Sequence, residues 1–185
     1  YFSPYSYRAE NGEIKTMQLG TDTYDYHYMD WYQIPKLLNK PYWSEPYYDD
    51  GGGEEMMTTY SKPLYDADGK LYAIITADLS LEWLTNLVGE IQAFNNSYNL
   101  MVSRNASFIV HPDRDLILNE TIFSSTYGDA DESLKKLQDD IVNCRAGEVL
   151  RTKDGGKFFV FYSPVETTQW TVAIVCPRSE LYMGV

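Results

Sequence analysis

The residues best suited to chemistry gather in one stretch of the sequence, between Asp30 and Leu84. Two carboxylates, Asp49 and Asp78, occur there with aromatic side chains at Trp31, Tyr32, Trp43, Tyr47, Tyr48 and Tyr60. Aromatic rings around fixed carboxylates suit a pocket for a small molecule that carries a positive charge. Carboxylates buried without a partner would be costly, so we expect a water, a metal ion or a cationic ligand beside them.

These carboxylates also have simpler interpretations. Asp78 stands just before a predicted helix, where it could cap the helix N-terminus instead of binding a ligand. The segment 49–55 resembles an acidic calcium loop, but it lacks the ligand spacing of an EF-hand and is more typical of a solvated, flexible loop. His27 is interpreted as a surface or pocket-rim side chain and His111 as a turn residue, and neither is expected to bind a metal.

The sequence contains no pattern typical of a catalytic centre. It has no nucleophile elbow, phosphate-binding loop or paired His and Cys ligands, and two histidines leave little for a metal site. Carboxylates are abundant enough for a glycosidase, but abundance is the only support for that class. We therefore expect no catalytic residue, metal or cofactor. The residues alone favour a domain that binds a small molecule, followed by a protein-interaction or adhesion module with exposed tyrosines, and then an enzyme.

Net charge narrows the possible partners. The 185 residues carry a formal net charge of -12 at pH 7 and a pI near 4.5, which excludes nucleic acid and disfavours an anionic membrane surface. No apolar run approaches the roughly 20 residues needed to cross a bilayer, so the chain is expected to be soluble as given. The first residues lack the basic start and apolar core of a signal peptide, and the chain is interpreted as a fragment.

Tyrosine and cysteine usage adds two expectations. The 17 tyrosines favour a β-rich domain with half-buried sheet faces, and a few of them would form a polar, aromatic binding surface. The two cysteines allow at most one intrachain disulfide. Cys176 lies in an apolar run that indicates a small buried side chain, and spacing alone cannot show that Cys144 comes close enough to bridge it.

The patterning predicts a first lobe over residues 1–80. Its expected strands are 5–8, 15–19, 55–65 and 70–79. Asp30 is a plausible N-cap for a helix that Pro41 ends. The last two strands are joined by a tight turn in which Gly69 can adopt positive φ.

A connecting helix is predicted over residues 81–97 and a second lobe over 98–185. After the N-cap Ser80, apolar residues recur at helical spacing, at Leu81, Leu84, Leu87, Val88, Ile91 and Phe94. The second lobe has a predicted helix from Asp131 to about Asn143, and its expected strands are 98–103, 107–111, 148–152, 157–163 and 169–176. Consecutive strands with helices between the two groups favour an α+β fold with antiparallel sheets and helices on one face.

Each lobe also carries a set of family-like motifs. In the second lobe these are His111-Pro112 after a strand, a hairpin strand at 156–164 and a final strand at 170–177. In the first lobe they are Trp31, Tyr42-Trp43, Pro46-Tyr47, Asp49, Thr59, Ser61, Pro63, Gly69, Asp78, Leu81 and Leu84. Together these motifs resemble the two modules of extracytoplasmic double-Cache sensors, in the right order and over nearly the whole chain.

The resemblance implies two PAS-like lobes in the extracytoplasmic, periplasmic part of a bacterial inner-membrane receptor. Flanking transmembrane helices would anchor the full-length protein, with a long N-terminal helix missing here and residues 179–185 leading into the returning helix. The variety is similar to sensors from gut Bacteroidetes whose outputs are histidine kinases or serine phosphatases. A homodimer of the full-length receptor is expected from the family.

The resemblance further implies a set of binding residues in the first lobe. The amino-acid-binding branch uses a tyrosine, an arginine two residues before a Trp-Tyr pair, a Tyr-x-Asp motif and a distal aspartate. Those positions fall here on Tyr24, Met29, Trp31, Tyr32, Tyr47, Asp49 and Asp78. Met29 replaces the arginine that would pair with a ligand carboxylate, which a thioether cannot do. The two aspartates that would hold an ammonium group remain, so an amine or another cationic metabolite fits best, with Trp43 and Tyr60 completing the predicted pocket.

Overall fold

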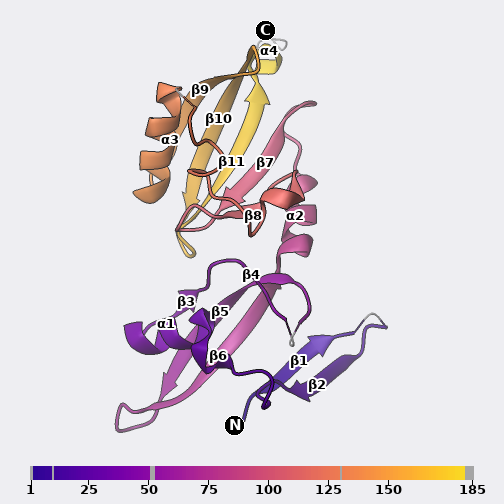
Figure 1. Ribbon diagram of the computed structural model, residues 1–185, viewed down its shortest axis with the longest axis vertical. Coiled ribbons are helices and arrows are strands. Elements are labelled where there is room, and N and C mark those ends of the chain that lie inside the picture. The colour runs from indigo at the N-terminus through magenta and orange to yellow at the C-terminus, as the bar shows by residue number, and fades with distance from the viewer. Residues whose placement is uncertain (1, 10, 51–52, 130, 182–185) are drawn as a thin grey trace. The chain divides into compact units, whose positions relative to one another are not determined.

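The computed structural model describes residues 2–9, 11–50, 53–129 and 131–181 (Figure 1). The chain divides into two compact units. The first comprises residues 1–44, 48–55 and 59–78, and the second comprises residues 45–47, 56–58 and 79–185. Both units combine antiparallel sheets with helices, so the predicted α+β class is confirmed.

A two-stranded hairpin opens the first unit. Strand β1 (Pro4–Arg8) pairs antiparallel with β2 (Ile14–Gln18), and Tyr5 lies opposite Met17. The connecting turn contains Gly12, whose φ of 84° lies in the left-handed region that glycine adopts without steric cost. Both strands lie within one residue of their predicted positions.

The main sheet of the first unit is built around one long central strand. Its members are β3 (Tyr42–Trp43), β4 (Tyr47–Tyr48), β5 (Met56–Tyr65) and β6 (Leu71–Ser80). The central strand β5 pairs with each of the other three. In the predicted β5–β6 hairpin turn, the Asp66 carboxylate accepts the backbone N–H groups of Asp68 and Lys70 at 3.0 and 2.8 Å. The hairpin is thus as predicted, whereas the two short strands β3 and β4 were not predicted.

One short helix precedes this sheet in the chain. A 3-10 turn, η1 (Tyr26–Tyr28), leads into α1 (Asp30–Leu38). The N-cap of α1 is Met29, so the prediction that Asp30 is the N-cap is wrong by one residue. Asp30 instead places a negative charge in the first turn, where the helix dipole favours it. The helix ends as Asn39 takes a left-handed conformation with φ of 52°.

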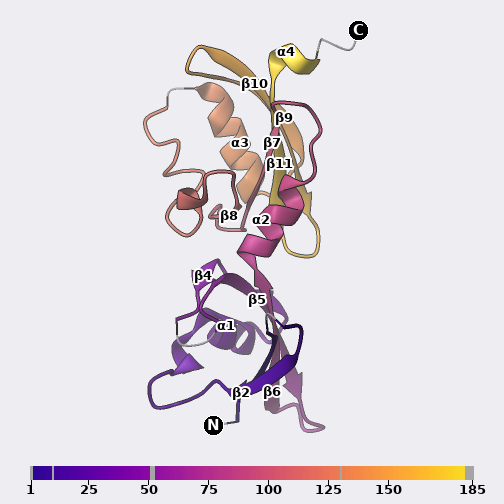
Figure 2. The same ribbon diagram turned by 90° about the vertical axis from the view of Figure 1, so that its right-hand side faces the viewer.

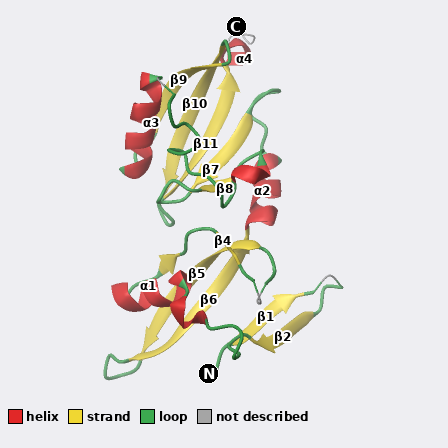
Figure 3. Cartoon of the chain, viewed as in Figure 1, coloured by secondary structure: helices red, strands yellow, loops and turns green. Residues whose placement is uncertain are grey.

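The second unit contains a five-stranded antiparallel sheet in the order β8-β7-β11-β10-β9 (Figure 3). Its strands are β7 (Tyr98–Val102), β8 (Phe108–Val110), β9 (Gly147–Lys153), β10 (Gly156–Val165) and β11 (Trp170–Pro177). All five were predicted. Helix α3 (Glu132–Val142) packs along β9, and it is capped by the Asp131 carboxylate, which accepts the Ser133 N–H at 2.9 Å.

The apolar core of the second unit lies between α3 and the sheet. Helix α3 contributes Leu134, Leu137 and Ile141, each at most 3% exposed. The sheet contributes Leu100, Val102, Phe108, Val149, Val160, Tyr162, Ala173 and Val175. The helical spacing of the three α3 residues and the alternation along the strands therefore bury one face of each element.

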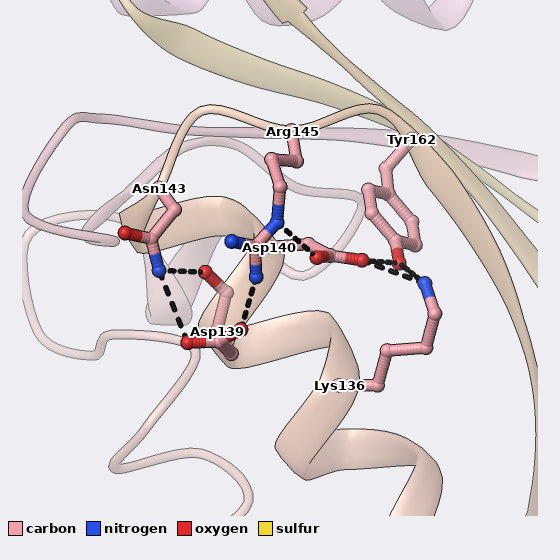
Figure 4. A network of polar contacts seen from close by, with 6 residues as sticks. All are labelled: Lys136, Asp139, Asp140, Asn143, Arg145 and Tyr162. Atoms are coloured by element: carbon pink, nitrogen blue, oxygen red, sulfur yellow. Dashed lines mark hydrogen bonds and ion pairs between the residues drawn. The ribbon is translucent and has the colours of Figure 1, made fainter.

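A polar network also ties α3 to β10 (Figure 4). The buried Asp140 carboxylate accepts hydrogen bonds from Lys136 Nζ and the Tyr162 hydroxyl, both at 2.6 Å, and from Arg145 Nε at 2.7 Å. These bonds, that from Lys136 first, hold the pKa of Asp140 well below its ordinary range. Gly147 lies against the same group, since a Cβ there would come within 2.7 Å of the Tyr162 hydroxyl oxygen.

Helix α2 (Leu81–Gly89) begins where the Ser80 hydroxyl accepts the Trp83 N–H, as predicted. Its buried residues pack toward β7 and β8, beside which the helix lies in Figure 2. The helix ends at Gly89, so its predicted continuation to Phe94 is wrong. Asn99 of β7 supplies the reason, because its Nδ2 donates to the carbonyl oxygens of Val88 and Ile91 at the end of the helix.

The remaining features concern the ends of the second unit. Cys144 and Cys176 are free thiols, and Cys176 is fully buried, as its apolar surroundings predicted. The last described element is α4 (Arg178–Leu181), and the predicted return toward a membrane falls largely on residues outside the described part. No helix in the described ranges has both the length and the apolar character needed to span a bilayer.

Candidate ligand-binding site

Buried polar side chains concentrate on the central strand of the first unit. Thr59 and Ser61 of β5 are 1% and 0% exposed, and Ser44, whose Oγ accepts the Thr59 N–H at 2.9 Å, is 2% exposed. The Ser61 hydroxyl is buried without a hydrogen-bond partner among the described residues. Buried hydroxyls contribute little to packing and are costly when unpaired, so this row indicates a functional surface.

Asp49, which follows β4, is a buried carboxylate with 3% exposure. Its two oxygens accept hydrogen bonds from the Tyr24 hydroxyl and the Gly53 N–H, both at 2.6 Å. Both donors are neutral, and no ion pair between described residues includes Asp49. The prediction of a solvated loop is therefore wrong for Asp49, while residues 51–52 of that loop lie outside the described part of the chain.

A second carboxylate, Asp78 of β6, is bonded to the same central strand. The Thr59 hydroxyl donates to Asp78 Oδ1 at 2.8 Å. Asp78 keeps solvent access, yet burial raises the pKa of its carboxyl group; the Thr59 hydrogen bond opposes this effect and the charge of Asp49 adds to it. Asp78 does not cap α2, because Ser80 has that role.

Tyr5 and Glu55 also lie near the two aspartates, and neither was predicted from the sequence as a site residue. Tyr5 of β1 lies close enough to Asp78 for each group to affect the pKa of the other. Burial, followed by the charges of Asp78, Asp49 and Glu55, raises the pKa of the Tyr5 hydroxyl to about 12. The sequence around Tyr5 is typical of an exposed hairpin strand, so no local sequence pattern distinguishes Tyr5 from Tyr7.

The resulting site is strongly negative. Three carboxylates act on one tyrosine hydroxyl, and none of the groups that shift the pKa of Tyr5 or Asp78 is cationic. No ion pair within the described ranges includes Glu55 or either aspartate. Over the same residues, no group of three or more His, Cys, Asp and Glu side chains has an arrangement that could hold a metal ion. The arrangement can stabilise a positive charge brought by a ligand.

An aromatic cluster surrounds the start of α1. The Trp31 ring stacks on Tyr26 with 5.6 Å between centroids and meets Tyr32 edge-on at 6.2 Å. Trp31 is buried, and its indole N–H has no acceptor among the described residues. Met29 lies between Tyr26 and Trp31 in the sequence and is half-buried. It occupies the position at which the amino-acid-binding branch has an arginine.

The structure does not bring every predicted pocket residue to this site. Trp43 and Tyr60 face each other across the β3–β5 pairing, with ring centroids 5.3 Å apart. Because side chains alternate along a strand, Tyr60 lies on the opposite face of β5 from Thr59. Tyr47 is half-buried in β4, and its contacts group it with the second unit. Among the predicted residues, Tyr24 is thus hydrogen-bonded to Asp49, and Asp49 lies close enough to Asp78 for its charge to affect the pKa of Asp78.

Comparisons with known proteins agree with this architecture. The family described as "Methyl-accepting chemotaxis protein-like, first PDC sensor domain" matches residues 1–86. The extracellular domain of the putative histidine kinase mmHK1S-Z3 is similar over 98% of this chain, with 30% sequence identity and a TM-score of 0.79. That of the putative histidine kinase mmHK1S-Z2 is similar over 97%, with 27% identity and a TM-score of 0.77. The chain has the fold of extracellular sensor domains of the histidine kinase and chemoreceptor type, and its first 86 residues match the PDC sensor family.

This chain spans 63% and 64% of the lengths of those two chains, less than two thirds of each. The ligand-binding domain of the Pseudomonas aeruginosa PAO1 chemoreceptor PctB, in complex with L-Gln, shares the fold over 100% of this chain and 70% of its own, with 19% identity and a TM-score of 0.70. The chain thus shares its fold with extracellular sensor and ligand-binding domains of histidine kinases and chemoreceptors.

Proposed function

We propose that the first unit binds a small organic cation, best matched by an amine. The observation that carries the proposal is that the charges of Asp49, Asp78 and Glu55 all act on the Tyr5 hydroxyl, while no ion pair between described residues includes any of the three. An ammonium group would supply the missing positive charge, and its N–H groups would donate to the carboxylates in short, charge-assisted hydrogen bonds. The Tyr5 and Tyr24 hydroxyls would hold the two aspartates in position.

Ligands of similar proteins support this chemistry. PctB has been solved with L-Gln and with L-Arg, and the chemoreceptor CtaA of Pseudomonas fluorescens with L-serine. Each ligand carries an ammonium and a carboxylate group. This chain keeps acidic residues for the ammonium group, but Met29 replaces the arginine expected to hold the carboxylate. We therefore infer a preference for amines that lack a carboxylate.

Aromatic side chains would complete the site. Trp31 and Tyr32 of α1 remain proposed contacts. Lys36 Nζ lies 5.5 Å from the centroid of the Tyr32 ring, so a ligand cation on that face would take the place of the lysine. Trp43, Tyr47 and Tyr60 are not part of the site proposed for the first unit. The full-length receptor would be anchored by flanking transmembrane helices and would signal as a homodimer.

The proposal is tested by thermal unfolding with a panel of amines, amino acids and carboxylates. A ligand at one hundred times its Kd should stabilise the chain by about 2.7 kcal/mol, a clear shift in Tm. Asp78→Asn should abolish the shift caused by amines, and the matched control Asp115→Asn, an exposed residue of η2 (Arg114–Leu116), should retain it. Stabilisation by carboxylates alone would overturn the proposal.

A gain-of-function variant tests the role of position 29. Met29→Arg should add a bidentate partner for a ligand carboxylate and so shift the preference from amines toward amino acids. The measurement is the ratio of the two affinities by calorimetric titration. An unchanged ratio in a folded Met29→Arg protein would remove Met29 from the site.

A further inference from the structure

The turn between β1 and β2 contains the only Asn-Gly pair in the sequence, Asn11-Gly12. The Asn11 side chain is exposed, and Gly12 has a φ of 84°. In such a pair the backbone nitrogen of the glycine can attack the side-chain carbonyl carbon of the asparagine, because glycine has no Cβ to obstruct the approach. The turn therefore has the residues needed for deamidation, a covalent change that requires no enzyme.

The hydrogen bonds of the turn favour attack on the Asn11 side chain. Asn11 Oδ1 accepts the backbone N–H of Glu13 at 3.1 Å, and Asn11 Nδ2 donates to Glu13 Oε2 at 2.8 Å. These two bonds hold the side-chain amide beside the backbone of the turn. A donor on Oδ1 also stabilises the negative charge that develops on this oxygen when the carbonyl carbon is attacked.

One hydrogen bond opposes the reaction. The Gly12 N–H donates to the Ala9 carbonyl oxygen at 2.8 Å, and this bond must open before the nitrogen can attack. The opening is local, because β1 and β2 form a two-stranded sheet of their own and all five residues of β2 are exposed. A two-stranded hairpin has little stability by itself, so the turn can open without unfolding of the rest of the first unit.

We propose that Asn11 is a site of spontaneous deamidation in the folded protein and that the aspartate product weakens the β1–β2 hairpin. The Gly12 nitrogen forms a bond to Asn11 Cγ, the bond from Cγ to Nδ2 breaks, and the amide nitrogen leaves as ammonia with the proton of the Gly12 N–H. Water then opens the cyclic imide at either carbonyl and gives aspartate or isoaspartate. In the aspartate product a second carboxylate faces that of Glu13, so repulsion replaces the hydrogen bond.

The first part of the proposal is tested by incubating the folded chain at neutral and at mildly alkaline pH, followed by peptide mass spectrometry. Asn11 should be converted, and faster at the higher pH, because the Gly12 nitrogen attacks after losing its proton. Asn119, which is exposed but precedes Glu120, is the control within the same chain and should stay intact. Conversion of Asn11 only in the urea-unfolded chain, or equal conversion of Asn119, would overturn the proposal.

Asn11→Asp supplies the product directly and tests its effect on the hairpin, which also carries Tyr5 of the acidic site. Backbone amides of β1 and β2 should exchange with solvent faster than in the original chain, while those of β10 in the second unit should be unchanged. Asn119→Asp adds the same charge outside the hairpin and should leave the exchange of β1 and β2 as it is. Equal exchange of the hairpin in Asn11→Asp and the original chain would show that the product does not weaken it.

Discussion

Replacing Asp140 with alanine should destabilise the second unit through the loss of three hydrogen bonds. The Tyr162 hydroxyl would lose its acceptor, and because Tyr162 is only 4% exposed this should cost about 1–3 kcal/mol. Lys136 and Arg145 have half-exposed side chains, so solvent screens the two lost ion pairs and they should add little to this cost. The expected loss is therefore about 1–3 kcal/mol, or a fall in Tm of about 2–12 °C for a chain of this length.

Thermal and urea unfolding of Asp140→Ala measure this loss directly. Asp139→Ala is the matched control, because Asp139 is the neighbouring residue and also pairs with Arg145 but is exposed, so it should cost less than about 1 kcal/mol. Equal losses in the two variants would refute the reasoning, since burial of the Tyr162 hydroxyl would then have no effect.

Acidification provides an independent check on Asp140. Its folded-state pKa is depressed, chiefly by the Lys136 hydrogen bond, so its contribution to stability is present above the ordinary aspartate pKa and is lost as pH falls toward the folded-state value. The stability difference between the original chain and Asp140→Ala should therefore narrow as the pH is lowered. A difference that stays constant would contradict the depressed pKa.

Three further predictions follow from single contacts. Gly147→Ala should lower the free energy of unfolding by about 1–3 kcal/mol, because its Cβ would displace the buried Tyr162 hydroxyl; an unchanged urea midpoint would contradict this. Ser80→Ala should cost about 1 kcal/mol in thermal unfolding through loss of the α2 N-cap, and a loss near zero would show that the cap is redundant. Amine affinity should fall as pH drops through the raised pKa of Asp78, because a cation binds the ionised carboxylate, while the unliganded chain gains stability from Asp78 in the same direction. Calorimetric titration at several pH values measures the first effect, and a pH-independent affinity would exclude Asp78 from the site.

Local patterns predicted most of the fold. Alternating apolar residues and a turn with Gly69 were sufficient for the β5–β6 hairpin, and a capping Asp131 before a helical period was sufficient for α3. The predicted length of α2 was wrong because its end depends on Asn99, which belongs to a strand outside the helix. The residues of the helix alone therefore could not predict this contact with Asn99.

The candidate site could be predicted only in part. Asp49 and Asp78 stood out by residue type and by resemblance to the family, but Tyr5 became part of the site because β1 lies close to Asp78. Tyr60 was predicted in the pocket from its aromatic character. Because side chains alternate along β5, Thr59 lies on the face that meets Asp78 and Tyr60 lies on the opposite face. Which face of a strand meets which loop depends on tertiary register, and no single-sequence pattern encodes it.

The most direct test of the proposed function compares two ligands that differ only in charge. An alkylamine and the alcohol with the same carbon skeleton should be titrated into the chain under identical conditions by calorimetry. The acidic site of Asp49, Asp78 and Glu55 predicts saturable binding of the amine, lost in Asp78→Asn, and no measurable binding of the alcohol. Equal binding of both ligands, or amine binding that survives in Asp78→Asn, would contradict a site selected by positive charge.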